Sequence, residues 1–89
     1  MNLEQEAIEA AIKAEIMVIA ETLGTDACDL RVDEVIPATG LIDSAGLLDL
    51  LAWFETEYKF KIPANEMTID NLGTVTAMAV YLRHRKGLA

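Results

Sequence analysis

The chain has 89 residues, enough for one small domain with a modest core, and a domain over residues 1–89 is expected, as a monomer. Its formal net charge of −8 at pH 7 argues against nucleic-acid binding, which depends on lysine and arginine contacts to phosphates. No apolar run reaches membrane-spanning length and the first residues lack the basic start of a signal peptide, so a cytoplasmic protein without membrane insertion is expected.

The charge is uneven along the chain. Residues 1–58 contain thirteen acidic and two basic residues, whereas residues 59–89 contain two acidic and five basic residues. The acidic part suits basic protein partners and electrostatically steered encounters. A need for solubility explains the same composition.

The first helix is predicted from about Asn2 to Gly24. Asn2 and Gln5 resemble a capping box at its start, and Gly24 is typical of a C-terminal cap. Apolar residues recur on one face at intervals of three or four residues: Ile8, Ile12, Ile16, Ile19 and Leu23. This periodicity predicts a helix with a buried stripe.

Residues 24–43 are predicted to form a long ordered loop. Several aspartates, Pro37 and Gly40 argue against a continuous helix, and no alternation indicates a strand. A loop of this length without regular structure usually marks either function or a wrong assignment. Apolar residues indicate that it packs on the core: Leu30, Val32, Val35, Ile36 and Leu41.

A second long helix is predicted from about Ser44 to Tyr58, with Leu47, Leu51 and Phe54 on its inner face. Asp43 and Ser44 directly precede the apolar run. Both residue types are preferred helix caps, because a side-chain oxygen accepts a hydrogen bond from a first-turn N–H. Taken alone, the pair is a cap. A phosphate ester on a hydroxyl placed there would also meet free N–H groups and the positive end of the helix dipole.

The remainder predicts a short helical turn within Ala64–Leu72, capped by Thr68, and a last helix capped by Thr74. The last helix ends in cations, which the negative end of the helix dipole favours: Arg83, His84, Arg85 and Lys86. The expected fold is all-α: a small four-helix bundle of three main helices and one short helix, with a long ordered loop between the first and second helices.

Catalytic groups are scarce. The single histidine, His84, lies in a basic helix end, where a solvated role is favoured over catalysis. The single cysteine, Cys28, offers no disulfide and no zinc-binding cluster. Glu55 and Glu57 are two residues apart and therefore point apart on a helix. The sequence predicts no catalytic residue, no metal site and no enzyme activity.

Together these features resemble the acyl carrier proteins and their peptidyl and aminoacyl relatives. Three motifs carry the resemblance: Asp43-Ser44 before the second helix, the segment 55–63 that closes it, and Gly73-Thr74-Val75 before the last helix. The resemblance implies that a phosphopantetheinyl transferase attaches 4′-phosphopantetheine from coenzyme A to Ser44. The thiol of this arm would carry an acyl or aminoacyl group as a thioester. Asp43 would cap the helix or contact the transferase.

The motif departs from the Asp-Ser-Leu-Asp of fatty-acid-type carriers, because Ala45 and Gly46 stand where Leu and Asp would be. Leu-Ile-Asp-Ser-Ala-Gly-Leu-Leu is closer to free-standing D-alanyl and aminoacyl carriers. Aminoacyl or specialised acyl cargo is therefore favoured over bulk fatty-acid synthesis.

The resemblance also implies an outer face on the second helix that meets the loading ligase and the downstream transferases. Its expected residues are Ala45, Gly46, Asp49 and Ala52, with Leu48 as an added apolar contact. A glycine on this face would let a partner's backbone approach closely. The alternative function is an acidic helical adaptor that has no prosthetic group and binds a basic protein partner.

Overall fold

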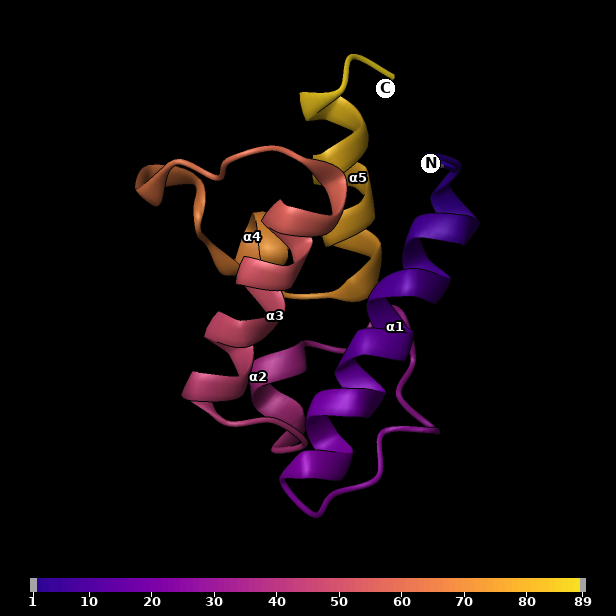
Figure 1. Cartoon of the computed structure of the whole chain (residues 1–89), viewed down its shortest axis with the longest axis vertical. Coiled ribbons are helices and arrows are strands. Elements are labelled where there is room, and N and C mark those ends of the chain that lie inside the picture. Colours follow the sequence, from indigo (N-terminus) through magenta and orange to yellow (C-terminus); the bar gives the residue numbers. More distant parts are fainter. Residues whose placement is uncertain (1, 89) are drawn as a thin grey trace.

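The computed structural model describes residues 2–88, which contain helices and no strand (Figure 1). The three long helices are α1 (Gln5–Thr22), α3 (Ser44–Tyr58) and α5 (Val75–Arg85). The short elements are α2 (Ile36–Thr39), the 3₁₀ turn η1 (Ala64–Glu66) and α4 (Ile69–Leu72). The predicted all-α bundle of three main helices is confirmed. The single short turn expected within Ala64–Leu72 is instead two turns, and α2 was not predicted.

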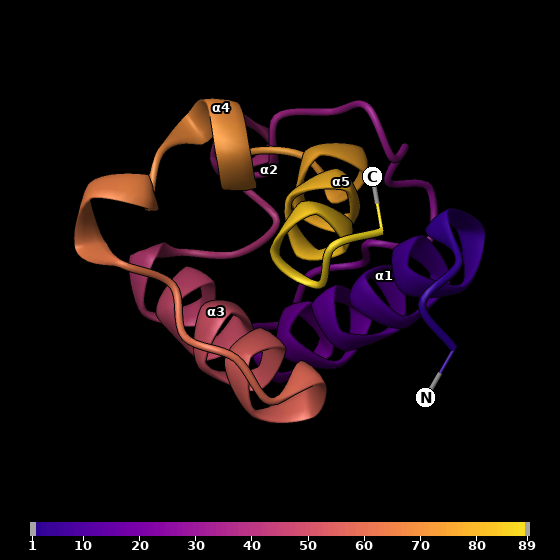
Figure 2. The same ribbon diagram turned by 90° about the horizontal axis from the view of Figure 1, so that it is seen from above.

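The long helices surround one apolar core. α1 packs against both α3 and α5, and Figure 2 shows α5 between the arms of the angle that α1 and α3 form. The largest fully buried side chains come from α1, α2, α3 and α5: Phe54, Ile8, Ile12, Ile16, Ile36, Leu50, Met78, Leu82 and Val75. The apolar stripes predicted for α1 and α3 therefore meet at the centre of the domain, although Leu23 of the first stripe is exposed and Leu47 of the second is only partly buried.

The predicted long loop is ordered, and α2 interrupts it. Pro37 occupies the first turn of α2, where its missing N–H needs no partner. Two backbone hydrogen bonds tie the loop to the α4–α5 junction: Ile36 N–H donates to the Gly73 carbonyl (2.7 Å), and Thr76 N–H donates to the Val32 carbonyl (3.0 Å). The buried apolar anchors are Ala27, Leu30, Ile36 and Ile42, whereas the predicted anchors Val32 and Val35 are exposed.

The two ends of α1 differ in how well they were predicted. At the C-terminal end, Gly24 adopts φ +81°, and its N–H and that of Thr25 donate to the carbonyls of Glu21 and Ala20. At the N-terminal end the capping box was wrong. Asn2 Oδ1 accepts from the N–H of Glu4 (2.9 Å), while Gln5, as the first helical residue, donates through its side chain to Glu9.

Across residues 2–88, no helix combines the length and the apolar character needed to cross a membrane.

Candidate functional site

The candidate site is the start of α3, where Asp43 caps the helix and Ser44 begins it. Asp43 is extended, with φ −89° and ψ −176°, and its Oδ1 accepts from the N–H of Gly46 at 2.7 Å. The predicted cap is confirmed for Asp43. Ser44 is exposed, and its hydroxyl has no hydrogen-bond partner within residues 2–88. Because the Asp43 side chain caps the helix, the Ser44 hydroxyl is not needed as a cap and is free to be modified.

The first turn of α3 also presents backbone donors. Gly46 N–H donates to the Asp43 side chain and Leu47 N–H to the Asp43 carbonyl. The N–H groups of Ser44 and Ala45 belong to the turn that has no intrahelical acceptors. A phosphate ester on Ser44 would therefore meet N–H donors and the positive end of the α3 dipole.

Two adjoining depressions lie beside Ser44, and we call them together the site groove. The outer one, about 290 Å³, is lined by Pro37, Ile42, Asp43, Ser44 and Leu47. The inner one, about 110 Å³, shares Pro37 and Leu47 with it and is completed by Leu51, Met67, Thr68, Ile69, Leu72 and Gly73. The start of α3 thus combines an exposed serine with an open and largely apolar groove.

Of the residues predicted to face partners, four are exposed and one is not. Ala45, Leu48, Asp49 and Ala52 are exposed, and within residues 2–88 the Leu48 side chain is the most exposed large apolar one, at 66%. We call these four residues the partner surface. The placement of Gly46 on this surface was wrong, because Gly46 is buried.

The burial of Gly46 follows from its place in the helix repeat. It lies four and eight residues before Leu50 and Phe54, and positions at these intervals share one helix face. A glycine contributes no apolar side chain, so a search for apolar periodicity passes over it. The spacing was the one signal that placed Gly46 inside.

The site groove includes residues that sequence reasoning did not assign to it. Pro37 comes from the unpredicted helix α2, Met67 from the segment between η1 and α4, and Ile69 from the first residue of α4. Met67 and Ile69 are distant from Ser44 along the chain, and none of the three residues belongs to a motif. Only the tertiary packing brings them to the start of α3.

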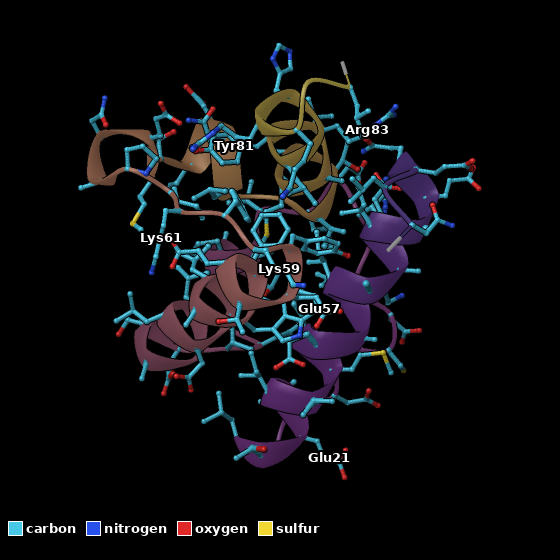
Figure 3. The ribbon with its side chains drawn as sticks, turned by 45° about the horizontal axis from the view of Figure 1, so that its top comes forward. Glu21, Glu57, Lys59, Lys61, Tyr81 and Arg83 are labelled. Carbon is cyan, nitrogen blue, oxygen red and sulfur yellow. The ribbon has the colours of Figure 1, made fainter. Side chains whose placement is uncertain are left out.

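The charged side chain next to Ser44 is Asp43, and the lysines that follow α3 lie at its other end. Lys59 and Lys61 follow the opposite end of α3, and Arg83 lies on α5 toward the first turns of α1, whereas Glu21 is at the far end of α1 (Figure 3). Within residues 2–88, no group of three or more His, Cys, Asp and Glu residues is placed to hold a metal ion.

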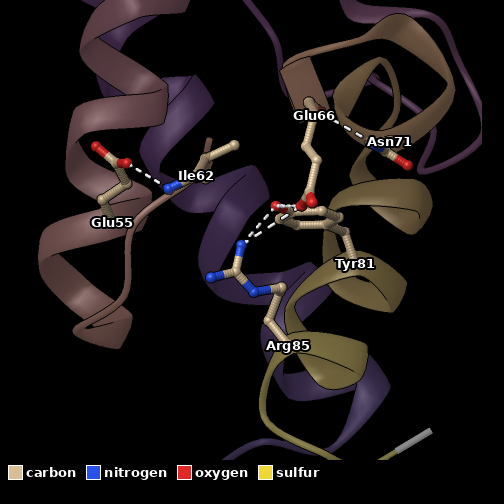
Figure 4. Close-up of polar contacts among 6 residues, drawn as sticks. All are labelled: Glu55, Ile62, Glu66, Asn71, Tyr81 and Arg85. Atoms are coloured by element: carbon tan, nitrogen blue, oxygen red, sulfur yellow. Dashed lines mark hydrogen bonds and ion pairs between the residues drawn. The ribbon is translucent and has the colours of Figure 1, made fainter. Parts of the chain in front are cut away.

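A second polar cluster joins η1 to α5 (Figure 4). The Tyr81 hydroxyl donates to the Glu66 carboxylate and accepts from the Arg85 guanidinium at 2.9 Å. Burial raises the pKa of Tyr81 above its ordinary value, and the hydrogen bond to Glu66 raises it further. Nearby, Ile62 N–H donates to the Glu55 carboxylate at 2.7 Å. These contacts hold the connector after α3 in place.

Comparison with known families gives the class of protein. A family model described as a phosphopantetheine attachment site matches residues 16–82. The chain therefore belongs to this family. Comparisons with curated proteins and with solved structures give no match. The protein is a carrier of the acyl carrier type with a covalently attached 4′-phosphopantetheine group, and its role is carriage and not catalysis.

Proposed function

We propose that Ser44 is the attachment residue and that the arm presents an aminoacyl or specialised acyl group to partner enzymes. The observation that carries this proposal is the exposed, unpartnered hydroxyl of Ser44 at the first residue of α3. A carrier needs an accessible serine and not an activated one, because the transferase supplies the catalytic groups.

The residues around Ser44 have distinct roles in this proposal. Asp43 holds the first turn of α3 through its bond to Gly46 N–H, and the N–H groups of Ser44 and Ala45 offset the negative charge of the phosphate ester. Once attached, the group supplies a thiol that forms a thioester with the cargo. The apolar side chains of the site groove lie next to the attachment point.

The motif after Ser44 favours short cargo. Ala45 and Gly46 replace the Leu and Asp of the fatty-acid-type motif, and the run is closer to that of D-alanyl and aminoacyl carriers. This supports aminoacyl or small acyl groups.

The proposed partners are a phosphopantetheinyl transferase, a loading ligase and downstream transferases, which would contact the partner surface. Leu48 supplies that surface with an exposed apolar side chain beside the carboxylate of Asp49. We expect the carrier to work as a monomer in the cytoplasm. The exposed free thiol of Cys28 is compatible with a reducing compartment.

The attachment is tested by incubating the protein with coenzyme A and a phosphopantetheinyl transferase and measuring intact mass. The wild type is expected to gain one phosphopantetheine, and Ser44→Ala none. Thr39→Ala is the matched control, since it removes the neighbouring hydroxyl that donates to the Ile36 carbonyl, and it should be modified normally. Modification that persists in Ser44→Ala would exclude Ser44 as the site.

The cargo is then identified with the protein that carries the arm. Its free thiol is offered a panel of amino acids and fatty acids together with candidate ligases, and the group that forms a thioester is the cargo. A wild type that never accepts the arm would instead favour the acidic adaptor that binds a basic partner.

A further inference from the structure

Gly46, the third residue of α3, lies against α1 and the end of the long loop. A side-chain Cβ at this position would be 3.0 Å from Ile19 Cγ2 and 3.2 Å from Ile42 Cβ. These separations are shorter than the roughly 3.5–4.0 Å at which carbon atoms attract one another. The first turn of α3 therefore lies where it does because residue 46 has no side chain.

The same residue takes part in the cap of the helix. Gly46 N–H donates to Asp43 Oδ1 at 2.7 Å, and an added Cβ would lie 3.3 Å from that oxygen. Ser44 lies in the same turn, between the acceptor and the donor of this bond. A displacement of Gly46 away from α1 would therefore alter both the Asp43 cap and the position of Ser44.

Backbone conformation does not explain this glycine. Gly24, Gly40 and Gly87 have positive φ, which favours glycine, but Gly46 does not. Within a helix, alanine is favoured over glycine wherever there is room for its methyl group. The close approach to Ile19 and Ile42 is the feature that requires glycine at residue 46.

We infer that Gly46 is a positioning residue for Ser44: its missing side chain seats the first turn of α3 on Ile19 and Ile42, which sets how the hydroxyl is presented to the transferase. The inference rests on the proposed attachment at Ser44. It assigns Gly46 an inward role in place of an outward contact with partners.

The first test is Gly46→Ala, assayed for arm transfer with the transferase and coenzyme A. We expect kcat to fall about 3- to 10-fold, because small misplacements of a reacting atom slow the chemical step. KM for the carrier should stay within about twofold, because the side chains of the partner surface are unchanged. Hydrogen exchange at the residue 46 amide should become faster as the Asp43 cap loosens.

The second test is rescue through Ile19. Ile19→Leu removes the branched methyl that the new Cβ would meet, whereas the matched control Ile19→Val keeps branching at Cβ. We expect Gly46→Ala with Ile19→Leu to recover kcat and amide protection, and Gly46→Ala with Ile19→Val to recover neither. If Gly46→Ala alone does not fold, the double variant Gly46→Ala with Ile19→Leu tests the inference instead. A normal kcat in this variant supports the inference, and a low kcat overturns it.

Wild-type kcat together with a protected amide in Gly46→Ala would overturn the inference. The exchange measurement needs no transferase. A wild type that never accepts the arm would therefore refute attachment at Ser44, while amide exchange would still report whether Gly46 seats the helix.

Discussion

Ser44 owes its exposed position to two neighbours, the capping carboxylate of Asp43 and the missing side chain of Gly46. The Asp43 carboxylate accepts the hydrogen bond from the first-turn N–H of Gly46, so this N–H does not need the Ser44 hydroxyl as an acceptor. The glycine lets that turn lie against α1. The Ser44 hydroxyl is thus fixed in position by its neighbours, and it forms no hydrogen bond within residues 2–88.

The Asp43 cap has a measurable effect on stability. Asp43→Ala is expected to lower the free energy of unfolding by about 1 kcal/mol, because the N–H of Gly46 loses its acceptor. Asp43→Asn keeps a side-chain oxygen and is the matched control, with a change of a few tenths at most. Urea unfolding followed by circular dichroism measures both. Equal losses in the two variants would show that charge, and not the cap, stabilises the turn.

Phe54 is the largest fully buried side chain of the core. Phe54→Ala should cost about 3–5 kcal/mol, because it removes apolar contacts and leaves a cavity. Thr56→Ala, at an exposed position of the same helix, is the control and should have little effect. A negligible shift of the unfolding midpoint for Phe54→Ala would contradict the packing of α3 described above.

The junction of α4 and α5 holds one wall of the site groove. Gly73 ends α4 and is buried, and its carbonyl accepts from the N–H of Ile36 in α2. The junction thereby connects α2 to α4 and α5, which lie some thirty residues further along the chain.

Gly73→Ala is expected to disturb this junction. A Cβ at residue 73 would lie 2.5 Å from the Ile69 carbonyl oxygen, which is backbone and moves only with the helix. The expected cost is about 1–3 kcal/mol of unfolding free energy, typical of overpacking. Nuclear magnetic resonance should place the largest shift changes at α2, α4 and the start of α5. An unchanged or higher stability would contradict the close contact.

The Tyr81 cluster predicts a pH dependence. Burial and the bond to Glu66 raise the pKa of Tyr81, so the folded protein holds the phenol proton more tightly than the unfolded chain does. Its stabilisation is therefore complete below the ordinary value of about 10 and is lost as pH rises through the raised pKa.

The test compares the wild type with Tyr81→Phe across this alkaline range. The stability advantage of the wild type should shrink above pH of about 10. Burial also raises the pKa of Tyr58, but Tyr58 is present in both proteins and cancels in the difference. A difference that stays constant with pH would contradict the role of the Tyr81 hydroxyl.

At the scale of the whole molecule, both charge and apolar contact are expected to contribute to the binding of partner proteins. A net charge of −8 favours encounters with basic partners, and Leu48 is an exposed apolar side chain four residues after Ser44. The start of α3 has the carboxylates of Asp43 and Asp49 as well as the exposed apolar side chain of Leu48, which suits a complex that is only partly electrostatic.

Loading by the cognate ligase is therefore expected to depend more on Leu48 than on salt. Leu48→Ala should lower kcat/KM for loading about tenfold, through lost apolar burial. Raising the salt concentration, or the charge control Asp49→Asn, should have a smaller effect. Steady-state loading assays at low and high salt measure all three. Loading abolished by salt but unaffected by Leu48→Ala would show that charge selects the partner.

The sequence by itself determined the all-α class, the bounds of α3, the Asp43 cap and the Thr74 cap of α5, because each follows from local periodicity or from a cap at a helix start. It also predicted the phosphopantetheine family, through motifs that lie mostly at helix starts. These features depend on residues a few positions apart.

Only the tertiary structure decided how closely Gly46 approaches Ile19 and Ile42, the presence of helix α2 and the site groove. Gly46 is buried by its approach to Ile19, α2 is held by a bond from Ile36 to Gly73, and the groove joins α2, α3 and α4. Glycine carries no apolar signal, and a four-residue helix has too few internal hydrogen bonds to form without packing. Contacts between distant segments decide such features, and no local pattern encodes them.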